Sequence, residues 1–233
     1  GRRCDGWLHS RHEGLLRRVH GLPGQSTFRP AAGLFHEGYV RRLRCLIRAD
    51  FGGHVDVIIG FSFGGLILQH FAADHGHLAS HMVMGGSAHR ISAEALKIDH
   101  RYAQLVNQGR DREAMAERAA AVFPPGVRRT LLAGVLWTLG PTLMGPVKGS
   151  FRQDVLIEAE AELAHHADDS LRRINSPILV VCGRDDFAFS VADVKEMVSL
   201  IPTATLKVYD QGHSTVFLDK HFVEDVRAFV AKQ

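Results

Sequence analysis

Four short apolar segments have the length and pattern of buried β-strands. Three of them, VDVIIG (55–60), HMVMGGS (81–87) and PILVVCG (177–183), are apolar runs that reach glycine and lack helical periodicity. The fourth, TLKVYDQG (205–212), alternates more clearly between apolar and polar positions. Short apolar runs of this kind indicate strands covered on both faces, which is typical of a parallel sheet.

Segments with helical periodicity lie next to these strands. They are GLILQHFAADHG (65–76), VADVKEMVSLI (191–201) and KHFVEDVRAFVAK (220–232), and EGYVRRLRCLIRADF (37–51) lies upstream. Strands that alternate with helices over short connections predict the α/β fold class. We therefore expect a mostly parallel sheet flanked by helices.

The alternation stops between residue 88 and residue 174, where no strand pattern occurs. Three helix-like blocks fill this region, at 92–123, 127–140 and 152–174, and Pro124–Pro125 and Gly140–Pro141 separate or interrupt them. We expect these helices to form an inserted cap, or lid, over one edge of the sheet.

The predicted domain organisation is a sheet-bearing core with one insertion. Residues 1–87 and 175–233 form the core, and residues 88–174 form the helical cap. A chain of 233 residues is long enough for one domain of this kind. The longest apolar stretch, residues 131–147, is shorter than the roughly 20 residues that a membrane span requires, so we expect it in the cap and predict no membrane span.

The net charge of +3 is uneven, because residues 1–50 hold ten Lys and Arg against four Asp and Glu. Aromatic residues do not interleave with these basic residues, so an exposed arginine-rich helix face is favoured over a nucleic-acid surface. The three cysteines have no regular spacing and indicate a reducing compartment, so we expect a cytoplasmic protein. The chain begins at Gly1 rather than Met, so the absence of a signal peptide carries little weight.

Cofactor and metal motifs are absent from the sequence. No glycine-rich loop is placed to cradle phosphate, and the histidine pairs His75/His77 and His165/His166 lack a third ligand at a recognisable spacing. We expect no cofactor and no metal, and a small-molecule substrate as the partner. The sequence leaves the oligomeric state open.

The segment GFSFGG joins the first predicted strand to the helix that follows it. Gly60, Ser62 and Gly64 form the Gly-x-Ser-x-Gly pattern of a tight strand-to-helix turn, which holds a serine hydroxyl at the carboxyl end of the sheet. The amino end of the following helix favours negative charge beside that hydroxyl. Ser62 is therefore the candidate nucleophile.

A serine nucleophile needs a base, and the base needs an acid that orients it. The segment VCGRDDFAFS places Asp185 and Asp186 just after the third predicted strand, and YDQGHSTVF places His213 just after the fourth. The order Ser, Asp, His along the chain is the order expected for this scaffold.

GFSFGG, PILVVCGRDD and DQGHSTVFL together resemble the α/β-hydrolase superfamily, and the resemblance extends over about residues 5–233. It implies Ser62 as the nucleophile, His213 as general base and acid, and Asp186 as the orienting acid. Asp186 lies three residues after Gly183, where the family usually has this acid, and Asp185 is the alternative.

The resemblance also implies two backbone donors for an oxyanion. One is the amide of Phe63, directly after the nucleophile. The other lies in CDGWLHS with Trp7 as the donor, or in VHGLPGQS with Leu22 as the donor. With Trp7, GLPGQS (21–26) matches a later turn of the family pattern, and the first strands of the family are missing. We then expect a truncated or divergent N-terminus.

The predicted function is a serine hydrolase that cleaves an ester, lactone or thioester through an acyl-enzyme. The cap is rich in Leu, Val, Trp and Met, which favours a largely apolar acyl or alkyl group. Phe61, Trp137 and Leu143 are the expected substrate-binding residues, and VLWTLGPTLM (135–144) is expected nearest the serine. The alternative is a non-catalytic binding relative, or an inactive fragment that lacks the oxyanion loop.

Overall fold

The structure is a computed structural model that describes residues 32–123, 126–144 and 149–231. The side chains of residues 32–36, 143–144 and 149–150 are not part of this description. The predicted Trp7 and Leu22, in the N-terminal segment, therefore lie outside the described residues.

The described strands form one parallel sheet in the order β1-β2-β3-β4. Their bounds are β1 Val55–Phe61, β2 Ala79–Gly85, β3 Ile178–Asp185 and β4 Ala204–Gly212. These are the four predicted strands, with ends that differ by at most two residues. The α/β fold class is confirmed, and all four carboxyl ends lie at the same edge of the sheet.

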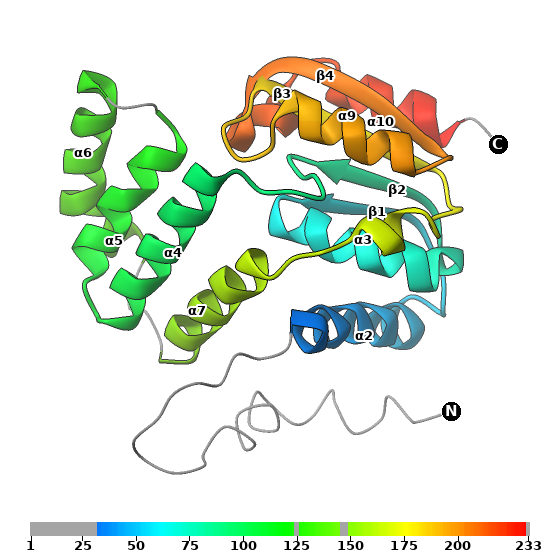
Figure 1. Cartoon of the computed structure of the whole chain (residues 1–233), viewed down its shortest axis with the longest axis horizontal. Helices are drawn as coiled ribbons and strands as arrows, with labels where there is room; N and C mark the ends of the chain where they lie inside the picture. The colour runs from blue at the N-terminus through cyan, green and yellow to red at the C-terminus, as the bar shows by residue number, and fades with distance from the viewer. Residues whose placement is uncertain (1–31, 124–125, 145–148, 232–233) are drawn as a thin grey trace, which may run out of the picture.

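Helices cover both faces of this sheet (Figure 1). One face packs against α3 and α9, with α2 outside α3, while the other face packs against α10. The bounds are α2 Ala32–Asp50, α3 Phe63–His75, α9 Val191–Leu200 and α10 Phe222–Val230, and short 3₁₀ turns occupy Gly76–Leu78 and His213–Leu218.

Alternate side chains of the central strands point to the two faces, as the period of two requires. Met82 and Val180 contribute to the core under α3 and α9, while Val83 and Val181 contribute to the core under α10. All four are fully buried. The near-continuous apolar runs seen in the sequence reflect this double coverage.

Helices fill the chain between β2 and β3, and most of them gather at one end of the molecule beside the sheet, whereas the last and shortest one packs against α3 and α9 (Figure 1). They are α4 Ala93–Asn107, α5 Asp111–Glu117, the 3₁₀ turn Arg118–Ala121, α6 Val127–Met144, α7 Gly149–Leu163 and α8 Asp168–Leu171. The first predicted block is split into α4 and α5, because Gly109 adopts φ 75° and ends the first helix.

The predicted interruption at Gly140–Pro141 is wrong, because α6 continues through Pro141. A proline in a helix deprives the carbonyl four residues earlier of its N–H donor, and here that carbonyl belongs to Trp137. The guanidinium of Arg112, on α5, donates to Trp137 O at 3.2 Å and so replaces the missing bond. Packing against α5 thus compensates for part of what the proline costs.

Candidate active site

Ser62 stands at the turn between β1 and α3 in a strained backbone conformation. Among the non-glycine residues that the structure describes, Ser62 alone has a positive φ, 51°. A Cβ added at Gly60 would lie 2.6 Å from the carbonyl oxygen of Gly64, so the turn tolerates no side chain there. The tight elbow expected from GFSFGG is therefore present, with the strain at the serine itself.

Neighbouring segments hold this elbow in place. The backbone N–H of Ser62 donates to the carbonyl of Gly85, at the end of β2, at 3.0 Å. A Cβ on Gly65 would lie 2.4 Å from the Cβ of Ser87, so α3 packs directly against the chain as it leaves β2. A Cβ on Gly64 would meet nothing within 4 Å.

The structure brings Ser62, His213 and Asp186 together from three separate loops. His213 Nε2 lies 3.1 Å from Ser62 Oγ. On the other side of the ring, His213 Nδ1 lies 3.0 Å from Asp186 Oδ2 and 3.2 Å from Oδ1. These contacts form a continuous hydrogen-bonded chain from hydroxyl to imidazole to carboxylate.

Asp186 rather than Asp185 makes the contact with His213. The Asp186 side chain is fully buried, and its Oδ1 also accepts the backbone N–H groups of Ala188 at 2.9 Å and Phe189 at 3.0 Å. Asp185 is the last residue of β3 and is exposed. The register between β3 and β4 also shifts by one residue here, between the pairs Gly183–Tyr209 and Asp185–Gly212.

Aromatic rings surround the imidazole of His213. The centroid of the Phe61 ring lies 5.1 Å from that of His213, and the rings of Phe187 and Phe189 lie at 5.8 Å and 5.7 Å. Phe61, expected as a substrate contact, packs on His213 and on Phe217. Phe187 and Phe189 were not predicted, although FAFS directly after the acid was a signal for them.

One carboxylate of the helical insertion lies near the imidazole, and others lie near that carboxylate. Asp99 on α4 pairs with Arg118 at 3.0 Å and lies close enough to His213 to interact electrostatically. Burial raises the pKa of Asp99, and the nearby Arg118 partly opposes that rise. On α7, burial first, then Asp99 and Glu158, raise the pKa of Glu162 to about 8. The helices nearest the sheet are thus more polar than expected.

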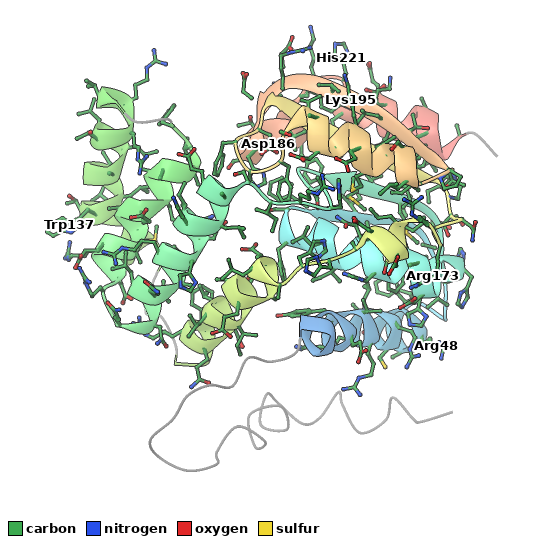
Figure 2. All side chains as sticks on the ribbon, in the orientation of Figure 1. Arg48, Trp137, Arg173, Asp186, Lys195 and His221 are labelled. Carbon is green, nitrogen blue, oxygen red and sulfur yellow. The ribbon has the colours of Figure 1, made fainter. Side chains whose placement is uncertain are left out.

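Trp137, expected to line the pocket over Ser62, lies instead on the outer side of the helical insertion. Figure 2 places it at the far end of these helices from Asp186, and α6 packs on α5 and the 3₁₀ turn that follows it. The reason is connectivity, since α4 and α7 adjoin the core segments whereas α6 lies mid-insertion. The Leu143 side chain is outside the described residues.

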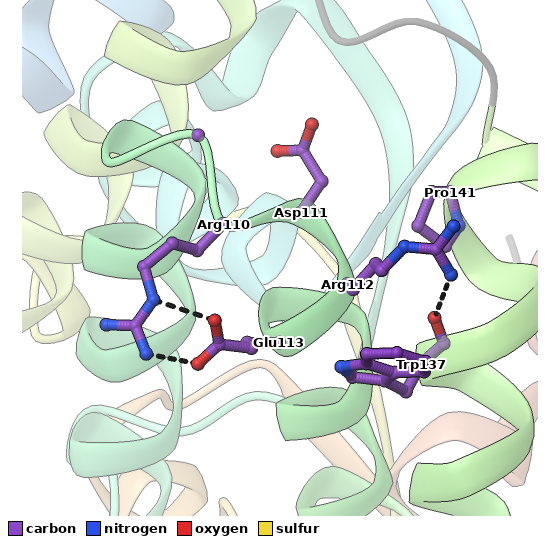
Figure 3. Close-up of a pocket in the computed structure, with 7 residues that line it drawn as sticks. Arg110, Asp111, Arg112, Glu113, Trp137 and Pro141 are labelled. Carbon is purple, nitrogen blue, oxygen red and sulfur yellow. Dashed lines mark hydrogen bonds and ion pairs between the residues drawn. The ribbon is translucent and has the colours of Figure 1, made fainter.

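The ring of Trp137 lies below the guanidinium of Arg112, 5.0 Å from its carbon (Figure 3). Trp137 lines a pocket of about 370 Å³ together with residues of α5, of the loop before α5 and of α6: Gly109, Arg110, Asp111, Arg112, Glu113 and Pro141. This pocket contains no residue of the Ser62 site.

The two expected oxyanion donors differ in what the structure shows of them. Phe63 is the first residue of α3, directly after Ser62, and its ring packs edge-on against Tyr39 of α2 at 5.8 Å. The position of its amide at a helix N-terminus suits a developing negative charge. The second expected donor, Trp7, lies outside the described residues.

Three further observations concern metals, membranes and the thiol of Cys182. Within the part of the chain that the structure describes, no three His, Cys, Asp or Glu side chains cluster as a metal site would require. No described helix combines the length and apolar content needed to cross a bilayer. Cys182 is fully buried in β3, and burial raises the pKa of its thiol to about 11, as for an unreactive core cysteine.

A parallel sheet with a serine elbow, an acid loop after β3 and a histidine after β4 defines an α/β hydrolase. The chain matches the model of the Alpha/beta hydrolase family over residues 9–228, and it belongs to that family. It is therefore a hydrolase-type enzyme, as expected. A comparison with curated proteins gave no significant match.

Solved structures with low sequence identity share this fold. MGS-M2, an alpha/beta hydrolase enzyme from a Medee basin deep-sea metagenome library, aligns with TM-score 0.64 and 19% identity, covering 83% of this chain and 71% of its own. The enol-lactonase of Burkholderia xenovorans LB400 aligns with TM-score 0.62 and 20% identity, covering 84% of this chain and 73% of its own. The esterase EaEST of Exiguobacterium antarcticum aligns with TM-score 0.61 and 18% identity, covering 84% of this chain and 73% of its own.

Proposed function

We propose that this protein is a serine hydrolase that cleaves a carboxylic ester, lactone or thioester through an acyl-enzyme. The observation that carries the proposal is the contact chain from Ser62 Oγ through His213 to the buried Asp186. A serine hydroxyl is a weak nucleophile alone, and an adjacent oriented imidazole is the arrangement that activates it.

Each group then has a defined task. His213 Nε2 takes the hydroxyl proton while Ser62 Oγ forms a bond to the substrate carbonyl carbon. The imidazolium returns this proton to the leaving oxygen or sulfur as the bond to the acyl carbon breaks. In the second half, His213 takes a proton from water as the water oxygen bonds to the acyl carbon, and the imidazolium then returns this proton to Ser62 Oγ as the bond from Oγ to the acyl carbon breaks and the acid leaves. Asp186 accepts a hydrogen bond from Nδ1–H throughout, which orients the ring and stabilises the imidazolium.

The negative charge on the substrate oxygen needs donors that face it. We assign the amide of Phe63 to one donor position, because it begins α3 directly after the nucleophile. Trp7 stays the proposed second donor. Helices α4–α7 are proposed as a lid that shapes the acyl pocket from the side of α4 and α7.

Support for the substrate class comes from two sources. A serine nucleophile suits acyl transfer, and two structural neighbours are described as an enol-lactonase and an esterase. The expected preference for apolar substrates depended on residues 131–147 near the serine. Because α6 lies remote from the site and the polar Asp99 lies near it, we propose a small acyl substrate without requiring it to be apolar.

The test is covalent labelling combined with turnover. A fluorophosphonate loses fluoride to an activated serine, so intact-mass analysis should show one adduct on the wild type and none on Ser62→Ala. Turnover of p-nitrophenyl acetate should fall on the order of 10⁶-fold in Ser62→Ala. Ser199→Ala, at an exposed serine on α9, is the matched control and should keep full activity. A wild type without adduct or turnover would indicate a non-catalytic relative.

A further inference from the structure

We propose that Gln69 is a positioning residue that clasps both connections of the helical lid to the helix that carries the nucleophile. It lies two turns after Ser62 on α3, among the buried residues Leu66, Leu68 and Phe71 of that helix, and it is fully buried. This inference deepens the proposed function, because it rests on the assignment of α4–α7 as a lid over Ser62.

The first connection, residues 86–92, leaves β2 and enters α4. Gln69 Nε2 donates to the carbonyl of Ala88 at 3.0 Å and lies 3.4 Å from Ser87 Oγ. Ser87 and Ala88 are both fully buried. The same amide group therefore holds the first residues of this connection against α3.

The second connection, residues 164–167, leads from α7 back to α8. Its residue His165 is buried, and His165 Nε2 lies 3.2 Å from Gln69 Oε1. An amide oxygen can only accept, so the imidazole donates this hydrogen bond. The ring of His165 also packs edge-on against His70, the next residue of α3, at 5.4 Å. One side chain thus binds the entry and the exit of the lid.

The first connection also lies beside the triad. Gly85, just before it, accepts the backbone N–H of Ser62 at 3.0 Å, and Ser92 N–H donates to the carbonyl of Ala188, in the acid loop, at 2.9 Å. A Cβ on Gly86, which has φ 52°, would lie 3.3 Å from His213 Nδ1. The two ends of this connection are thus bonded to the elbow and to the acid loop independently of Gln69, so loss of the Gln69 amide should loosen the segment between them and leave the triad in place.

A buried amide is costly unless its donors and acceptor are satisfied, and an apolar side chain would fill the same space without that cost. The hydrogen bonds of the amide fix the positions of connections 86–92 and 164–167 relative to α3, and no other described side chain joins these two segments through hydrogen bonds. The geometry therefore assigns Gln69 to holding the lid in register with Ser62.

The test uses variants of both ends of the clasp. Gln69→Met keeps the side-chain volume but loses the hydrogen bonds to Ser87, Ala88 and His165. His165→Leu loses only the hydrogen bond between His165 and Gln69, and His165→Gln retains a donor for it. In Gln69→Met and His165→Leu, amides of 86–92 and 164–167 should exchange hydrogen at least about tenfold faster, while those of β1–β4 stay unchanged. His165→Gln should exchange as the wild type does.

The kinetic measurement separates a positioning role from a structural one. With p-nitrophenyl hexanoate, KM should rise about tenfold in Gln69→Met and His165→Leu, because the lid shapes the pocket for the longer acyl group. The rate of fluorophosphonate labelling should stay within about twofold of wild type, because the triad residues remain in place. His165→Gln should restore the wild-type KM.

Three results would overturn the proposal. They are unchanged exchange in both connections, faster exchange spread equally over the sheet, and a His165→Gln variant as impaired as His165→Leu. If Gln69→Met does not fold, the pair of His165 variants decides alone. If the wild type takes no fluorophosphonate, the proposed function fails, and the exchange measurement still tests the clasp.

Discussion

Replacing Asp186 by asparagine should inactivate the enzyme by reversing the direction of a hydrogen bond. Asp186 Oδ1 accepts two backbone N–H groups, from Ala188 and Phe189, whereas Oδ2 lies nearest His213 Nδ1. An asparagine keeps its oxygen toward the two N–H donors, so its NH₂ group faces the imidazole. Nδ1 must then accept, and the ring proton moves to Nε2, which faces Ser62 Oγ at 3.1 Å.

An imidazole that carries its proton on Nε2 cannot take one from the serine. In the general Ser-His-Asp mechanism this change costs about 10⁴-fold in kcat, which corresponds to about 5.4 kcal/mol of lost transition-state stabilisation. The two backbone bonds to Oδ1 survive, so the fold should be retained. Asp185→Asn removes the same charge from an exposed neighbour and should change kcat less than about twofold.

The assay is the turnover of p-nitrophenyl acetate by both variants, with thermal unfolding as the check on folding. A loss near 10⁴-fold in Asp186→Asn with little change in Tm would support the tautomer argument. An equal loss in the two variants, or a larger loss in Asp185→Asn, would refute it.

Further predictions concern packing and pH. Gly65→Ala, whose Cβ would lie 2.4 Å from Ser87 Cβ, should cost about 1–3 kcal/mol in urea unfolding, whereas Gly64→Ala, in open space, should not destabilise the fold; similar losses would contradict this packing. Because burial raises the pKa of Glu162 from 4.5 to about 8, the unfolded state binds fewer protons between these values, and the free energy of unfolding should fall as pH rises. Glu162→Gln should lose less stability between pH 5 and 8, and an equal loss would exclude this role for Glu162.

Ser62 and its hydrogen-bond partners show which parts of the site a local sequence pattern can predict. The strand ends, Ser62 and His213 could be predicted because parallel strands deliver their carboxyl ends to one edge of a sheet. The choice between Asp185 and Asp186 depended on family resemblance, since both come shortly after the predicted strand 177–183. Their burial separates them only in the folded protein, where one side chain is fully buried and the other is exposed.

The helical insertion shows where local pattern fails. Its helices were predicted, but the apolar and polar residues of α6 are not separated onto opposite faces, so its periodicity could not tell an inner face from an outer one. Trp137 was placed beside the serine for that reason. The helix also continues through Pro141, because Arg112 from α5 supplies the donor that the proline lacks.

The sequence by itself determined the strands of the parallel sheet, the strained turn at Ser62 and the position of an acid and of His213 just after two later strands, because each of these depends on residues that are close together in the chain. The tertiary structure decided which acid meets His213, which helices lie nearest the site, and how Gln69 meets Ser87 and His165. Such contacts join side chains that lie 18 and 96 residues apart. The hydrogen-bond partners of these buried polar groups come from distant parts of the chain, so no local sequence pattern could identify those partners.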